Sequence, residues 1–124
     1  MAHDSIQTQL ADYQRRYREI AAQIGEVGLV ISGSLAARYN RCGTPGCRCH
    51  ADPPQPHGPY WHWTTKVNGK TVNRRLNARE AELYKDWIDN DRRLRSLVAE
   101  LRNTASAATQ LILEEERRQG SDKV

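Results

Sequence analysis

Apolar side chains in the first 25 residues recur at the spacing of an amphipathic helix. Starting at Ile6, successive intervals are 4, 3, 4, 3 and 4 residues, which is the a/d seam of a coiled coil. The seam consists of Ile6, Leu10, Tyr13, Tyr17, Ile20 and Ile24. Gly25 and Gly28 follow it, and glycine is common just after a helix C-terminus. The pattern predicts a helix over residues 4–25.

A second seam with the same spacing lies in the C-terminal third of the chain. Its positions are Leu83, Trp87, Asn90, Leu94, Leu97, Leu101, Thr104, Ala108 and Leu111. Asn77 precedes it, and Glu80 lies three residues further on, as in a capping box. We therefore predict a long coiled-coil helix over residues 78–117, about 60 Å in length.

The first predicted helix is only about half as long as the second, at 1.5 Å per residue. Much of the second seam, from about Leu94 to Leu111, should then lack a partner within the chain. We expect this part of the helix to pack against a second copy, which predicts a homodimer.

Between the helices the pattern has the period of β-strands. Residues 60–67 alternate, so that Trp61, Trp63, Thr65 and Val67 share one face and Tyr60, His62, Thr64 and Lys66 share the other. Asn68-Gly69 joins this segment to residues 70–76, and Asn-Gly between β-prone segments favours a type I′ hairpin turn. Residues 30–41 supply a third strand, and the proline-rich segment 51–59 is a loop. We interpret the tryptophans as sheet core; stacking on nucleic-acid bases is the alternative.

All three cysteines lie within eight residues, at Cys42, Cys47 and Cys49, with His50 and His57 nearby. Structural Zn²⁺ takes four N/S ligands in a tetrahedron, and Cys₃His is one of its usual sets. Both histidines are candidates for the fourth ligand. The odd cysteine count argues against a disulfide framework. A redox thiol switch remains an alternative to zinc.

Positive charge is concentrated beside the cysteines. Residues 31–77 have a formal charge of +6, against −1 for residues 1–30 and −1 for residues 78–124. The only acidic residue of the central segment is Asp52, and its basic residues are Arg38, Arg41, Arg48, Lys66, Lys70, Arg74 and Arg75. A basic hairpin of this kind can follow phosphates, and a two-stranded ribbon fits the major groove of DNA.

Length and composition limit the remaining possibilities. A chain of 124 residues without phenylalanine forms one domain with a small core. No apolar run approaches the 18 residues or so of a membrane span, and residues 1–10 lack the apolar core of a signal peptide. We expect a cytoplasmic protein. A catalytic zinc site usually has a carboxylate base nearby, and Asp52 is the single candidate, so we expect no enzyme activity.

Several motifs resemble those of a small uncharacterised prokaryotic family. They are the Cys42-Gly43-x-Pro45-x-Cys47-Arg48-Cys49 knuckle, the His57-Gly58-Pro59-Tyr60 turn and the Gly69-Lys70 hairpin, within residues 32–101. The resemblance implies His57 as the fourth ligand, with His50 as runner-up. It also implies an association with mobile elements and no known enzyme activity.

These inferences combine into one predicted molecule of class α+β. It has a helix at 4–25, a zinc-bound basic β head at 29–76 with a three-stranded antiparallel sheet, a long helix at 78–117 and a disordered tail at 118–124. We expect it to bind nucleic acid, DNA before RNA, as a coiled-coil dimer. The alternative is a zinc-stabilised scaffold that docks a larger protein such as a recombinase.

Overall fold

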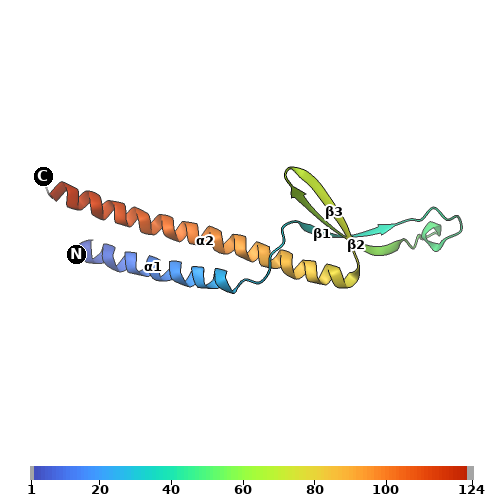
Figure 1. Ribbon diagram of the computed structural model, residues 1–124, viewed down its shortest axis with the longest axis horizontal. Helices are drawn as coiled ribbons and strands as arrows, with labels where there is room; N and C mark the ends of the chain where they lie inside the picture. Colours follow the sequence, from blue (N-terminus) through green and yellow to red (C-terminus); the bar gives the residue numbers. More distant parts are fainter. Residues whose placement is uncertain (1, 123–124) are drawn as a thin grey trace. The chain divides into compact units, whose positions relative to one another are not determined.

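A computed structural model describes residues 2–122 and has the predicted α+β architecture. In chain order, one helix precedes and one follows a three-stranded antiparallel sheet and the cysteine-rich loop (Figure 1). The elements in chain order are α1 (Ala2–Glu26), β1 (Ser34–Asn40), the 3₁₀ turn η1 (Arg48–His50), β2 (His57–Val67), β3 (Lys70–Leu76) and α2 (Ala78–Asp122).

Both helices extend slightly beyond the predicted limits. α1 begins at Ala2 and ends at Glu26, next to the first glycine. α2 begins at Ala78 as predicted but continues to Asp122. Most of the segment predicted to be a disordered tail is therefore helical, and residues 123–124 of that tail lie outside the described residues.

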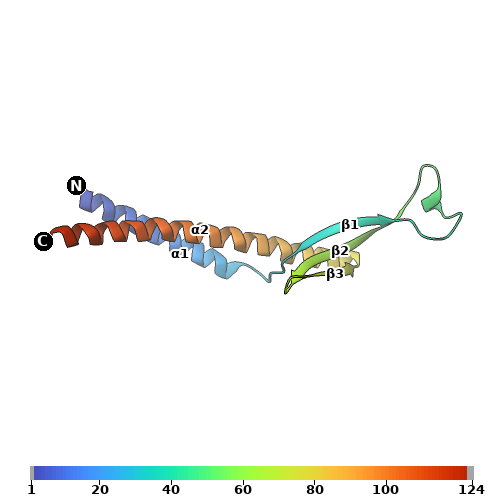
Figure 2. The same ribbon diagram turned by 90° about the horizontal axis from the view of Figure 1, so that it is seen from above.

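The strands have the order β1-β2-β3, and both neighbouring pairs are antiparallel (Figure 2). Val67 pairs with Lys70 across the two-residue turn, where Asn68 has φ 52° and Gly69 has φ 78°. Two consecutive positive φ values define the type I′ turn that the Asn-Gly pair predicts. Because this turn fixes the register, it also fixes which side chains share a face of the sheet.

The chain forms two compact units. The first, which we call the head, is residues 28–91 and contains the sheet, the cysteine-rich loop and the first turns of α2. In the head, Leu76, Tyr84 and Ile88 form a buried core, and Trp61, Trp63 and Trp87 pack against it. The Tyr84 ring contacts both Trp63 and Trp87, with centroid distances of 5.2 and 5.4 Å. All three tryptophans thus pack against the core, and for Trp61 and Trp63 this is the role that the strand pattern predicts.

Two hydrogen bonds attach the backbone of the segment before β1 to α2, one from the Asn90 side chain and one to the Trp87 backbone. The Asn90 amide donates to the Leu29 carbonyl at 2.8 Å, and the Ile31 N–H donates to the Trp87 carbonyl at 3.1 Å. The polar residue at seam position 90 therefore has a structural role, because it satisfies a carbonyl of the connecting chain.

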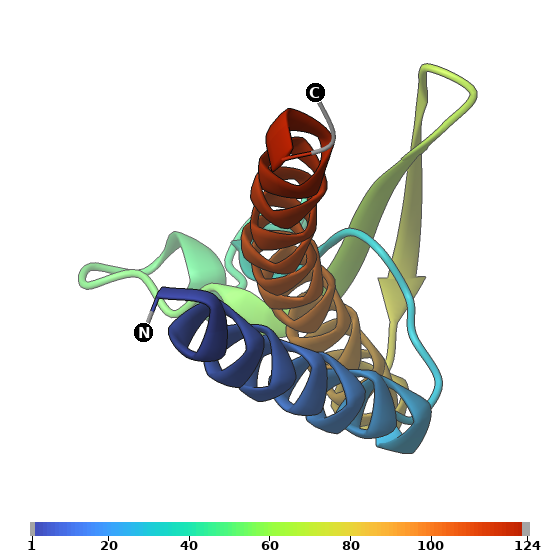
Figure 3. The same ribbon diagram turned by 90° about the vertical axis from the view of Figure 1, so that its left-hand side faces the viewer.

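The second unit, which we call the hairpin, is residues 2–27, which contain α1, together with residues 92–122 of α2. The two helices lie alongside each other and run in opposite directions (Figure 3). Ile20 of α1 and Leu97, Thr104 and Ala108 of α2 are buried. The expectation that the seam from Leu94 to Leu111 lacks a partner within the chain is therefore wrong, because α2 packs on the sheet first and on α1 afterwards. No helix of the described part is long and apolar enough to cross a membrane.

Candidate metal centre

The loop between β1 and β2 carries the candidate ligands, at the end of the sheet opposite the Asn68-Gly69 turn. Cys42 follows β1, Cys47 precedes η1, Cys49 lies within η1, and His57 is the first residue of β2. Asn40 pairs with His57 across the two strands, after an irregularity in register that follows Arg38. The pairing of β1 with β2 therefore places His57 close to the start of the cysteine-rich loop.

A tight turn orients the middle cysteine. Pro45 and Gly46 are its central residues, and the Cys47 N–H donates to the Thr44 carbonyl at 3.3 Å. Gly46 has φ +80°, as the third residue of a type II turn requires, and proline is favoured at the second. The η1 turn follows at once, with the His50 N–H donating to the Cys47 carbonyl at 2.9 Å.

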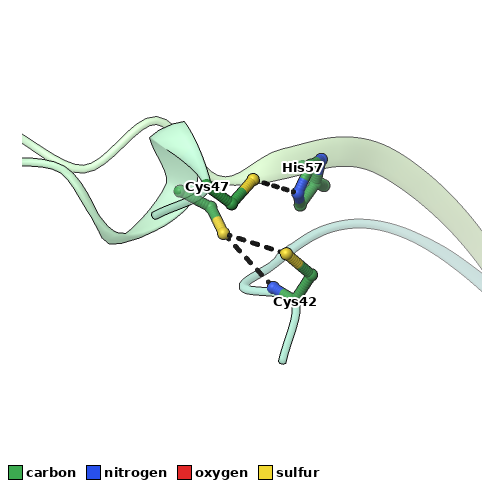
Figure 4. A group of neighbouring side chains, drawn as sticks. Cys42, Cys47 and His57 are labelled. Atoms are coloured by element: carbon green, nitrogen blue, oxygen red, sulfur yellow. Dashed lines mark hydrogen bonds between the residues drawn. The ribbon is translucent and has the colours of Figure 1, made fainter. Parts of the chain in front are cut away.

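These local turns bring four donor atoms together. The Sγ atoms of Cys42, Cys47 and Cys49 and a ring nitrogen of His57 all lie within 4.8 Å of one another. Figure 4 shows the side chains of Cys42, Cys47 and His57 directed toward a common point. The Cys42 and Cys49 sulfurs are 3.5 Å apart, and Cys47 Sγ is 3.3 Å from His57 Nε2.

The geometry fits a tetrahedral ion. Ligand atoms at zinc bond lengths lie about 3.5–3.8 Å apart at the corners of a tetrahedron. These two distances are close to this range, whereas a disulfide would need sulfurs about 2.05 Å apart. All three cysteines are free thiols. The four residues therefore form a candidate metal site of the Cys₃His type.

Electrostatics around the sulfurs differ from one cysteine to the next. The hydrogen bond from the Thr44 backbone lowers the pKa of Cys42 to about 6, with smaller contributions from His57, Cys49 and Cys47. Cys49 is fully buried, and desolvation raises the pKa of its thiol, although the Cys42 N–H donates to its sulfur at 3.3 Å. A backbone N–H directed at sulfur favours the thiolate, which is the form that binds metal.

His50, the alternative ligand, does not join the four donors. It is exposed, and its Nε2 contacts the Cys42 carbonyl oxygen at 2.5 Å. Its ring thus supports the backbone of a candidate ligand from outside the cluster. The placement agrees with the choice of His57 that the family resemblance implies.

The comparisons with known proteins bear on the same segment. A family model described as a domain of unknown function, DUF6788, matches residues 10–85, more than half of the chain. The chain belongs to this family. The match contains all four candidate ligands and the whole sheet, and it starts upstream of the motif resemblance at residues 32–101. No curated protein and no solved structure matches the chain.

In this DUF6788 chain, the seven basic residues predicted to bind nucleic acid do not share one surface. By strand register, Arg38, Lys66 and Arg75 are on the face of the sheet opposite α2, which we call the outer face. Lys70 and Arg74 are on the other face, with Trp63 and Val67. Arg41 and Arg48 are exposed residues of the cysteine-rich loop.

The two arginines before Leu76 have aromatic partners. Arg74 donates to the Tyr84 hydroxyl at 2.9 Å, and its guanidinium lies 5.7 Å from the Trp63 ring centroid. The Arg75 guanidinium lies 4.0 Å from the centroid of Tyr60 on the outer face. Although both arginines are exposed, Arg74 belongs to the edge of the core, so its removal would test packing as well as charge.

Asn73 is a candidate functional residue that the sequence analysis missed. Its side chain accepts from His62 Nδ1 at 3.1 Å and donates to Thr64 Oγ1 at 3.3 Å. The signal was available, because counting outward from the Asn68-Gly69 turn pairs Asn73 with Thr64. Asparagine carries no charge, so the concentration of basic residues in the central segment does not point to it.

Proposed function

We propose that this DUF6788 chain is a zinc-binding protein whose head binds nucleic acid. The donor set supports zinc, because three thiolates and one imidazole close a tetrahedron and suit the borderline-soft Zn²⁺ ion. Thiolates also disfavour Mg²⁺ and Ca²⁺, which take oxygen ligands. A closed set of four protein ligands gives the ion a structural role. It fastens the loop between β1 and β2 and thereby the end of the sheet.

The outer face of the sheet is the observation that carries nucleic-acid binding. Arg38, Lys66 and Arg75 lie on it, and no acidic residue of the described strands shares it. Its other side chains are polar or small, namely Ser34, Ala36, Tyr60, His62, Thr64, Thr71 and Asn73. A positive polar face of this kind attracts phosphates and releases their counterions on binding.

Salt dependence tests this proposal. For a 20-base-pair duplex of random sequence, the logarithm of the binding constant should fall linearly with the logarithm of the salt concentration. The double variant Arg38→Gln/Lys66→Gln should reduce that slope by about two units, since each phosphate contact contributes about one. Arg117→Gln/Arg118→Gln removes the same charge from exposed positions near the end of α2 and should leave the slope unchanged.

Absence of binding to duplex and single strands at low salt would refute nucleic-acid binding. Equal effects of the two double variants would show that general basicity, and not the outer face, attracts the phosphates. Zinc content is measured on the same samples, so that loss of the metal is not mistaken for loss of a phosphate contact.

The second candidate function is a scaffold that docks a larger protein, such as a recombinase. The hairpin favours it, because Tyr17, Ile112 and Leu113 are 40–45% exposed. Residues of both helices, Tyr17 and Ala105 among them, line an open cavity of about 360 Å³. In this proposal α2 supplies the docking surface, and the zinc-bound head folds independently of the partner.

A further inference from the structure

The centre of the outer face holds a connected row of hydrogen-bonding side chains. His62 Nδ1 donates to Asn73 Oδ1 at 3.1 Å, and Asn73 Nδ2 donates to Thr64 Oγ1 at 3.3 Å. Arg75 pairs with His62 across the strands, and its guanidinium is stacked over Tyr60. These contacts hold the long side chains in place before any ligand arrives, which lowers the entropy cost of binding.

Positive charge lies on both sides of this row. Arg38 pairs with Tyr60, and Lys66 lies six residues further along β2, about 20 Å away at 3.3 Å per residue. The major groove of B-DNA is about 12 Å wide and accepts a β-ribbon. A sheet seated in it, with its strands running along the groove, would place the polar row over base edges and one cation beyond each end of the row, where each can approach a phosphate.

The row suits a duplex better than a single strand. Single-strand binding depends on aromatic rings on which bases stack. Here Trp61 and Trp63 are on the α2 side of the sheet, packed on the core, and the Tyr60 ring is covered by Arg75. The deep major groove of A-form RNA is too narrow for such contacts, so the duplex in question is DNA.

We infer that Asn73 and Arg75 contact base edges of duplex DNA in the major groove, an inference that rests on the proposed nucleic-acid function. Asparagine pairs in bidentate fashion with adenine, and arginine with guanine. The two residues alternate on one strand and lie about 6.6 Å apart, which equals about two base-pair steps of 3.4 Å. The preferred site therefore contains an adenine and a guanine about two steps apart.

Selection from a random duplex library tests the inference. The wild-type protein should enrich a short motif with adenine and guanine in that spacing. Asn73→Ala should lose the adenine preference. Arg75→Lys keeps the positive charge but not the guanidinium group that binds guanine in bidentate fashion, so it should lose the guanine preference. Each change should cost about tenfold to a hundredfold on the preferred site and little on random sequence.

Lys66→Gln is the matched control, because it lies on the same face and should weaken binding to all sequences alike. Tryptophan emission from the head checks that each variant folds. Salt-dependent binding without an enriched motif, or equal affinity for single strands, would overturn the inference and leave the proposed function standing. No binding to any nucleic acid would overturn both.

Discussion

His57 and His50 belong to the same cysteine-rich segment but differ in what their ring nitrogens contact. His57 Nε2 is 3.3 Å from the Cys47 sulfur, whereas His50 Nε2 contacts the backbone carbonyl of Cys42. The first arrangement places His57 in the candidate metal site. The second is that of an outer partner which orients the chain carrying a ligand.

Substitution of the two histidines should separate these roles. His57→Ala and Cys47→Ser should each weaken zinc binding by more than about 100-fold, because each removes one of four ligands, and outer partners alone account for about 10–100-fold. His50→Ala should weaken it by less, within the range of about 10–100-fold that outer partners account for. Competition with a chromogenic chelator measures the affinities.

His62→Ala is the control for this series, since His62 lies on the outer face and contacts Asn73. It should leave zinc affinity unchanged. If His50→Ala abolished binding and His57→Ala did not, the ligand assignment would be reversed.

Only part of this site could be predicted from the local sequence. The spacing of Cys42, Cys47 and Cys49 around the Pro45-Gly46 turn indicates a metal knuckle without further information, because the turn is local. The choice between the histidines is different, since it depends on the pairing of Asn40 with His57 across two strands. That pairing follows from the path of a proline-rich loop, which side-chain periodicity does not describe.

At the scale of elements, a capping box lies where the chain passes from β3 into α2, the longest helix described. Glu80 N–H donates to Asn77 Oδ1 at 2.8 Å, and the Asn77 N–H donates to Glu80 Oε1 at 3.0 Å. This is the capping box that the sequence predicts, and it satisfies two of the otherwise unpaired N–H groups near the helix start. Leu76 and Ala81 are both buried, so the cap also sets how the helix leaves β3.

Asn77→Ala should therefore destabilise the head by about 1 kcal/mol, the usual cost of losing an N-cap side chain. Asn77→Asp should retain most of the stability, because aspartate caps about as well. Urea unfolding followed by tryptophan fluorescence measures the loss, since all three tryptophans pack against the core of the head.

Glu82→Ala is the matched control for the cap. Glu82 is an exposed residue of the same helical turn, and its ion pair with Arg79 at 3.0 Å should contribute well under 1 kcal/mol. Equal losses from Asn77→Ala and Glu82→Ala would contradict a specific role for the capping box.

The elements also show where periodicity stops being informative. The seam of α2 predicts a helix and its apolar stripe, and both are present. The pattern does not say what covers the stripe. Asn90, which interrupts the seam, marks the change of partner, because its amide binds the Leu29 carbonyl within the head, and α1 accompanies the residues beyond it.

At the scale of the whole molecule, the open question for α2 is what covers its last turns. Leu97 is only 4% exposed within the hairpin, whereas Ile112 and Leu113 are each 45% exposed. The two residues are consecutive in α2, and exposed large apolar side chains that gather in one region of a surface are typical of an interaction site. We propose that a second copy of the hairpin covers them, which keeps the homodimer but moves its interface toward the end of α2.

The oligomeric state distinguishes this interface from the one that the seam predicts. Wild-type protein should sediment with twice the mass of a 14.2 kDa chain at micromolar concentration. Ile112→Asp/Leu113→Asp should produce a folded monomer, with the helix content retained in circular dichroism. Leu97→Asp should instead lower the helix content, because it places a carboxylate at a position buried by the chain itself. A wild-type monomer would refute the dimer. A folded monomer from Leu97→Asp would indicate that the dimer interface lies along the middle of α2. It would also contradict the burial of Leu97 within the hairpin.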